Sequence, residues 1–154
     1  MSQVLLAGPL GEVTKSVLSE AAFLFCDELS EGAAPLEARL VEATITFEGA
    51  TPGRITLRLP WHVACEAAAN LLGAEPGDDD VEANAHAAVG ELLNMISGSA
   101  LERWFGSGSQ WSLGLPSVSE REGRLPSSAP RGELVALAID DARIELEASL
   151  GSVT

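Results

Sequence analysis

Glu91 and Asn94, in the apolar stretch GELLNMISG at residues 90–98, carry the groups of a possible reaction site. A side-chain amide can donate a hydrogen bond to one atom while it accepts another from a water molecule. Such a group can orient the attacking water in phosphoryl hydrolysis, where positioning and electrostatics supply most of the catalysis. An amide suffices only when the phosphoryl group arrives with its own metal and charge-stabilising groups. The substrate would then be another protein with its own active site, docked through a cation that meets Glu91.

Other chemistries for this pair are excluded by the residues around it. No Ser, His or Cys completes a nucleophile and base pair with them. One carboxylate and one amide bind a divalent ion poorly, so no metal site is expected. A structural alternative stays open, because Glu and Asn on the outer face of a helix are usually just solvated.

A long helix over residues 79–105 is expected to carry this pair. Helical spacing gathers one row of residues that would face a sheet, namely Val89, Leu93, Ile96, Ala100 and Trp104. Glu91, Asn94 and Gly98 fall on the opposite side, with Ala87 in the same row. A glycine inside a helix costs about 1 kcal/mol relative to alanine, so Gly98 suggests close approach by another surface. Asp79 and Glu82 have the spacing of a capping box at the start of this helix.

The remaining pattern predicts one α+β domain over residues 1–154, with long helices on one face of a largely antiparallel sheet. Helices are expected at residues 10–30 and 61–73. Two hairpins are expected, one from strands 38–48 and 54–59 and the other from strands 133–139 and 143–150. A short strand is expected at 110–115 and a mobile surface loop at 116–131. A long helix followed by a hairpin occurs twice, which suggests a pseudo-twofold repeat. The sequences of the two halves do not themselves repeat convincingly.

Charge and composition restrict the partners. The formal net charge of −14 argues against binding to nucleic acid or to an anionic membrane surface. No apolar stretch is long enough to span a membrane, and the N-terminus has no signal-peptide pattern, so we expect a cytoplasmic protein. Cys26 and Cys65 are far apart, and free thiols are favoured over a disulfide.

Several other residues invite a functional interpretation, and a structural one is favoured for most. His62 and His86 have no further ligand at metal-binding spacing. Residues 78–80, a run of three aspartates, lack the ligand pattern of a calcium loop and suit a helix start. Trp104 is expected in the core, whereas Trp61 and Trp111 suit the core or an interface equally well.

Residues 82–116 resemble the CheX branch of the CheC/CheX/FliY chemotaxis phosphatase family. The resemblance is carried by the Glu–x–x–Asn pair, by the Met95 and Gly98 that follow it, and by a proline some twenty residues later, Pro116. The order of helices and hairpins across nearly the whole chain also agrees.

The resemblance implies hydrolysis of the aspartyl phosphate of a CheY-like response regulator. Asn94 would enter the regulator's active site and orient the attacking water, while Glu91 would pair with the regulator's lysine. Ala87, Met95 and Gly98 would contribute to the docking surface. The Mg²⁺ would belong to the regulator, so no cofactor of this chain's own is expected. CheX-like members form homodimers with one site per chain, and the first helix here has no Glu–x–x–Asn.

Two departures from the family pattern leave an alternative open. The family often has Asp or Ser four residues before the glutamate, where this chain has Ala87, and Pro116 lies one residue closer than usual. The alternative function is a catalytically silent module of the same fold that binds a response regulator or a motor component.

Overall fold

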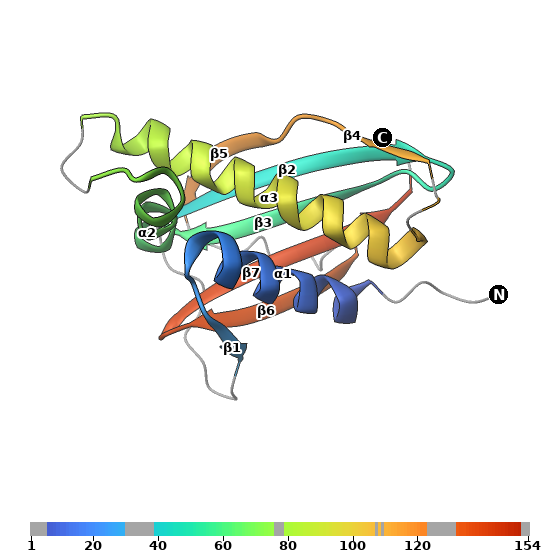
Figure 1. Ribbon diagram of the computed structural model, residues 1–154, viewed down its shortest axis with the longest axis horizontal. Coiled ribbons are helices and arrows are strands. Elements are labelled where there is room, and N and C mark those ends of the chain that lie inside the picture. The colour runs from blue at the N-terminus through green and yellow to red at the C-terminus, as the bar shows by residue number, and fades with distance from the viewer. Residues whose placement is uncertain are drawn as a thin grey trace.

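The computed structural model describes residues 6–29, 39–75, 79–106, 108, 110–122 and 132–151. In these residues three helices cover one face of a seven-stranded antiparallel sheet, as Figure 1 shows. The predicted two-layer α+β architecture is therefore confirmed. No helix in the described ranges is both long enough and apolar enough to cross a membrane.

The helices are α1 (Ala7–Ala22), α2 (Trp61–Leu72) and α3 (Val81–Phe105). Helix α3 runs diagonally across the sheet in Figure 1 and packs against both other helices as well as against the strands beneath it. The predicted inner row of α3 is fully buried at Val89, Leu93, Ile96 and Ala100. Trp104 is only half-buried, and its indole nitrogen donates a hydrogen bond to the carbonyl of Leu6.

The strands follow the order β1-β6-β7-β3-β2-β4 across the sheet, and β5 also pairs with β2. Their bounds are β1 (Cys26–Glu28), β2 (Arg39–Gly49), β3 (Gly53–Pro60), β4 (Trp111–Leu113), β5 (Ser117–Glu122), β6 (Glu133–Ile139) and β7 (Ala142–Leu150). Both predicted hairpins are present. Asp140, at the turn of the second hairpin, has a φ of 53°.

The expected pseudo-twofold repeat is visible in the strand pairing. The two hairpins meet through their second strands, with Leu57 of β3 opposite Leu146 of β7. The short strand after α1 pairs with the first strand of the second hairpin, as β1 with β6. The two short strands after α3, β4 and β5, both pair with the first strand of the first hairpin, β2. Each half of the chain therefore completes the sheet of the other half.

The predicted helix 10–30 was wrong over its last third. Helix α1 ends at Ala22, and Phe23 takes a left-handed conformation with a φ of 52°. The amide of Leu24 then bonds the carbonyl of Leu18, and the chain continues as β1. Helical spacing of apolar residues continued past the turn, but pairing with β6 decides the conformation of residues 26–28.

The predicted loop 116–131 was wrong where β5 forms, and residues 123–131 lie outside the described part of the chain. Strand β5 has the sequence SVSERE, in which only Val118 is a large apolar residue. Its polar composition suits an edge strand, because charged side chains discourage pairing with further chains. Pairing with β2 runs from Ser117 opposite Thr44 to Glu122 opposite Arg39.

The start of α3 also differs from the prediction. The helix begins at Val81 after Asp80, and Asp80 makes no side-chain capping bond, so the capping box from Asp79 to Glu82 is wrong. Glu82 is instead 3.3 Å from the guanidinium of Arg39 on β2. The Glu82 side chain therefore ties the start of α3 to β2 and makes no local cap.

The first turn of α1 is capped from a distant strand. The Glu133 carboxylate on β6 accepts hydrogen bonds from the amides of Leu6 and Ala7, at 2.9 and 3.0 Å. These amides would otherwise lack partners at the helix start, where a negative charge also interacts favourably with the helix dipole. The contact ties α1 to the second hairpin.

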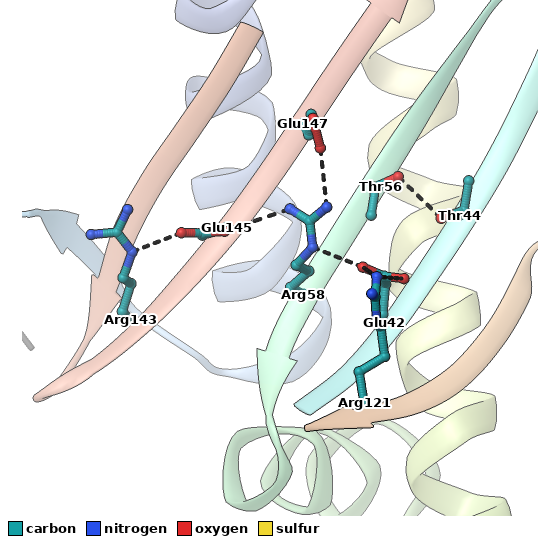
Figure 2. Close-up of polar contacts among 8 residues, drawn as sticks. All are labelled: Glu42, Thr44, Thr56, Arg58, Arg121, Arg143, Glu145 and Glu147. Atoms are coloured by element: carbon teal, nitrogen blue, oxygen red, sulfur yellow. Dashed lines mark hydrogen bonds and ion pairs between the residues drawn. The ribbon is translucent and has the colours of Figure 1, made fainter. Parts of the chain in front are cut away.

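The sheet carries an ionic network that centres on Arg58 of β3 (Figure 2). Its guanidinium bonds the carboxylates of Glu42 at 2.8 Å and Glu147 at 3.0 Å, and lies 3.5 Å from that of Glu145. The Glu145 side chain is fully buried and is also bonded by Arg143 at 2.9 Å. Three strands are therefore joined through one mostly buried cation.

Candidate functional site

A shallow groove of about 530 Å³ lies between α3 and the segment that connects β4 to β5. It is lined from the helix by His86, Ala87, Gly90, Glu91 and Asn94, and from the connecting segment and β5 by Leu115, Pro116 and Val118. The groove thus brings the predicted reactive pair together with Pro116, which the sequence analysis had singled out separately.

Glu91 and Asn94 are both exposed on α3. Neither side chain makes a hydrogen bond or ion pair with any residue in the described ranges. Residues three positions apart on a helix lie on neighbouring turns, about 5–6 Å apart at their Cβ atoms. Leu92 and Leu93 between them are fully buried, so the helix is fixed at this point while the two polar groups face outward.

The second wall of the groove rests directly on the helix. A Cβ atom built on Gly90 would lie 3.3 Å from Cγ2 of Val118 and 3.5 Å from Cγ of Pro116. A glycine at this position therefore lets the chain before and along β5 approach α3 closely. The exposed Glu91 follows immediately, at the rim of this contact.

The predicted docking residues are distributed unequally. Ala87 is exposed and lines the groove, whereas Met95 and Gly98 are partly buried and do not line it. A Cβ atom built on Gly98 would meet no atom of the described residues within 4 Å beyond its own helix backbone. Internal packing therefore does not require glycine at position 98.

Sequence reasoning missed four of the residues that line the groove as site residues, namely His86, Gly90, Leu115 and Val118. His86, expected to be structural, has a buried Nε2 that bonds no described residue and lies 3.6 Å from the carboxylate of Glu120. That carboxylate also binds Arg39 at 2.9 Å, and the Arg39 guanidinium stacks on Trp61. Leu115 is 92% exposed, and no periodic pattern marked it.

Helix α1 shows how the other half of the repeat differs. Its Glu12 and Lys15 have the same spacing as Glu91 and Asn94, but both are held in ion pairs. Lys15 bonds Glu28 at 2.6 Å, and Glu12 pairs with Arg103. An ammonium donates hydrogen bonds but accepts none, so Lys15 cannot position water as an amide can.

The remaining candidates for chemistry are free cysteines. Cys26 and Cys65 are both unpaired thiols, as expected. Burial raises the pKa of the Cys26 thiol to about 11, which keeps it protonated and unreactive near neutral pH. Within the ranges that the structure describes, no three His, Cys, Asp or Glu side chains gather to hold a metal ion.

Comparison of the sequence with models of protein families establishes the family to which the chain belongs. The model of the family described as "Chemotaxis phosphatase CheX" matches residues 41–138, which run from β2 to most of β6 and include the whole groove. The chain belongs to the CheX family. The resemblance noted in residues 82–116 is thereby confirmed.

Solved CheX structures share this fold over nearly their full length. A CheX chemotaxis protein from Vibrio vulnificus is 21% identical with a TM-score of 0.76, and the match covers 98% of this chain and all of the other. CheX from a Desulfovibrio desulfuricans subspecies is 22% identical with a TM-score of 0.73, and the match covers 95% of this chain and 99% of the other.

The CheX–CheY–BeF₃–Mg²⁺ complex from Borrelia burgdorferi contains a similar chain. It is 18% identical with a TM-score of 0.71, and the match covers 97% of this chain and all of the other. Comparison with curated proteins gave no match.

Proposed function

We propose that this CheX-family protein hydrolyses the aspartyl phosphate of a CheY-like response regulator. The observation that carries the proposal is the exposed Glu91–Asn94 pair, which has no side-chain partner among the described residues and lies at the rim of a groove. Two further findings support it: membership of a family of chemotaxis phosphatases, and a related CheX chain solved in complex with CheY.

In the proposed mechanism, Asn94 positions the nucleophile. Its carbonyl oxygen accepts a hydrogen bond from water, while its NH₂ group can donate to an oxygen of the regulator's active site. Water held in this way lies in line with the phosphorus–oxygen bond that breaks. The regulator supplies the Mg²⁺ and the groups that neutralise the phosphoryl oxygens, so this chain needs no cofactor of its own.

Glu91 supplies the docking charge. Its exposed carboxylate pairs with the regulator's lysine, and the pairing is steered by the strongly negative net charge of −14. The helix holds Glu91 and Asn94 at a fixed spacing, so the ion pair also sets how far the amide reaches. We further propose that the protein acts in the cytoplasm and as a homodimer.

The experiment that tests this function follows loss of phosphoryl label from a panel of response regulators. The wild-type protein should accelerate loss from a cognate regulator, and Asn94→Ala should remove that acceleration. Asn84→Ala is the matched control, because Asn84 lies on the same helix but outside the groove. Equal activity of wild type and Asn94→Ala would disprove the mechanism.

A second candidate is a silent binding module of the same fold. Ala87 favours it, because a methyl group lines the groove where the family often has Asp or Ser. This module would bind a regulator activated with beryllofluoride, an acyl-phosphate mimic, without changing the rate at which the phosphorylated regulator loses its phosphate. Measured acceleration by the wild type would eliminate it.

A further inference from the structure

Leu115 is the most exposed large hydrophobic side chain in the described part of the molecule. It is 92% exposed, compared with 68% for Phe25 and 48% for Leu72. Single exposed apolar residues are common on protein surfaces, so exposure alone decides nothing. The position of Leu115 is more informative, because it lines the groove that contains Glu91 and Asn94.

The backbone on both sides of Leu115 is fixed. The amide of Gly114 donates a hydrogen bond to the carbonyl of Thr46 at 2.8 Å, and a Cβ atom on Gly114 would lie 3.2 Å from Oγ1 of Thr46. On the other side, Pro116 packs against Gly90. Strands β4 and β5 both pair with β2. The leucine is therefore presented outward by an anchored segment, which lowers the entropic cost of using it in binding.

The surroundings of Leu115 specify the surface it fits. Pro116, Val118 and the methyl group of Ala87 give the groove an apolar side, and Glu91 gives it a negative rim. No described residue provides a cation for Glu91. The complementary surface is an apolar hollow beside a positive charge.

We propose that Leu115 anchors docking of the response regulator by inserting into an apolar hollow beside the regulator's lysine. This inference rests on the proposed partner and goes beyond the two polar residues. An aliphatic side chain can neither transfer a proton nor orient water, so Leu115 acts on affinity and on choice of regulator. Residues that carry much of the binding energy lie near the centre of an interface in well-packed, desolvated pockets, and a leucine that fills such a pocket gains the free energy of burying its apolar surface.

Binding of a beryllofluoride- and Mg²⁺-activated CheY-like regulator tests the proposal, with the regulator chosen as the tightest binder of a panel. Leu115→Ser should raise Kd by about tenfold to a hundredfold, and Leu115→Met should restore most of the affinity. The rate constant at saturating regulator should not change. Leu72→Ser is the matched control, because Leu72 is exposed at the end of α2 and outside the groove.

The outcomes separate the two proposals. A Leu115→Ser protein that melts like wild type and binds with unchanged Kd overturns the anchor, whatever the activity. Weaker binding of Leu115→Ser to a regulator that the wild type binds but does not dephosphorylate supports the anchor and overturns the phosphatase. Absence of binding to every regulator of the source organism overturns both.

Discussion

The ring of Pro116 lies against Gly90, the residue immediately before Glu91 on α3. This contact joins two segments that are distant in sequence and makes the groove a fixed feature of the fold. It also explains why a helix with an otherwise buried inner face has a glycine at position 90. A side chain there would meet Val118 at 3.3 Å, closer than ordinary van der Waals contact.

The two glycines of α3 should respond differently to replacement by alanine. Gly98→Ala fills open space, so helix propensity should raise the free energy of unfolding by about 0.5–1 kcal/mol. Gly90→Ala should fail to gain this increment, because Val118 and Pro116 must move, and it should weaken regulator binding by displacing the groove wall. Urea denaturation of both variants measures the contrast. Equal stabilisation of both variants would show that Val118 and Pro116 move aside for a Cβ atom at position 90 without an energetic cost.

The cap of α1 should be energetically important despite its origin on β6. Glu133→Ala removes the acceptor for the amides of Leu6 and Ala7 and should lower the free energy of unfolding by about 1–2 kcal/mol. Glu20→Ala, at an exposed position of the same helix, serves as the control. Hydrogen exchange in the first turn of α1 should accelerate in Glu133→Ala only. Unchanged exchange there would mean that another group caps the helix.

The spacing of apolar residues along the chain predicted most of the fold correctly, because helical and strand periodicities depend only on residues that are close in sequence. The inner row of α3 and both hairpins follow from such spacing. Strands β1 and β5 were missed for the opposite reason. Cys26 lies opposite Ile139 and Val118 opposite Ala43, and these pairings decide the conformation of segments that are short or polar.

The candidate site likewise contains residues that local sequence indicates and residues that depend on contacts between distant segments. Glu91 and Asn94 could be proposed from the sequence because both groups lie on one short helical stretch, and the structure places both side chains exposed in the groove. Leu115 was not found, since its exposure depends on how Gly114 is held by β2 and how Pro116 meets α3. A surface that two segments build together is visible only once they are folded.

The network around Arg58 should make this arginine difficult to replace. Arg58→Met leaves the fully buried Glu145 with one partner and removes the cation from Glu147, so we expect a loss of about 3 kcal/mol in unfolding free energy. Lys15→Met is the control. It breaks the more exposed pair with Glu28 and should lower the unfolding free energy much less than Arg58→Met does. Comparable losses in the two variants would show that the network contributes no more than a surface pair.

The partly buried thiol of Cys26 should make stability fall in alkaline solution. Burial raises its pKa from 9.0 to about 11, so between these values the unfolded chain releases a proton that the folded protein keeps. The folded state then binds more protons, and its stability decreases as pH rises. The free energy of unfolding, measured by denaturation at about pH 8 and about pH 10.5, should decrease less between these pH values for Cys26→Ser than for wild type. Parallel decreases would show that Cys26 titrates alike in both states.

Asn94→Asp separates the water-positioning amide from a merely polar contact. The substitution keeps the shape of the side chain, removes its NH₂ donor and adds a negative charge toward the phosphoryl group. Loss of one positioned hydrogen-bond donor, together with charge repulsion, should lower the rate constant at saturating regulator by about a hundredfold or more. The fold should be unaffected, because Asn94 is exposed and bonds no described residue. Single-turnover loss of label at several regulator concentrations measures the rate constant and KM separately. A change confined to KM would mean that Asn94 only docks the regulator, and the water-positioning role would then have to be abandoned.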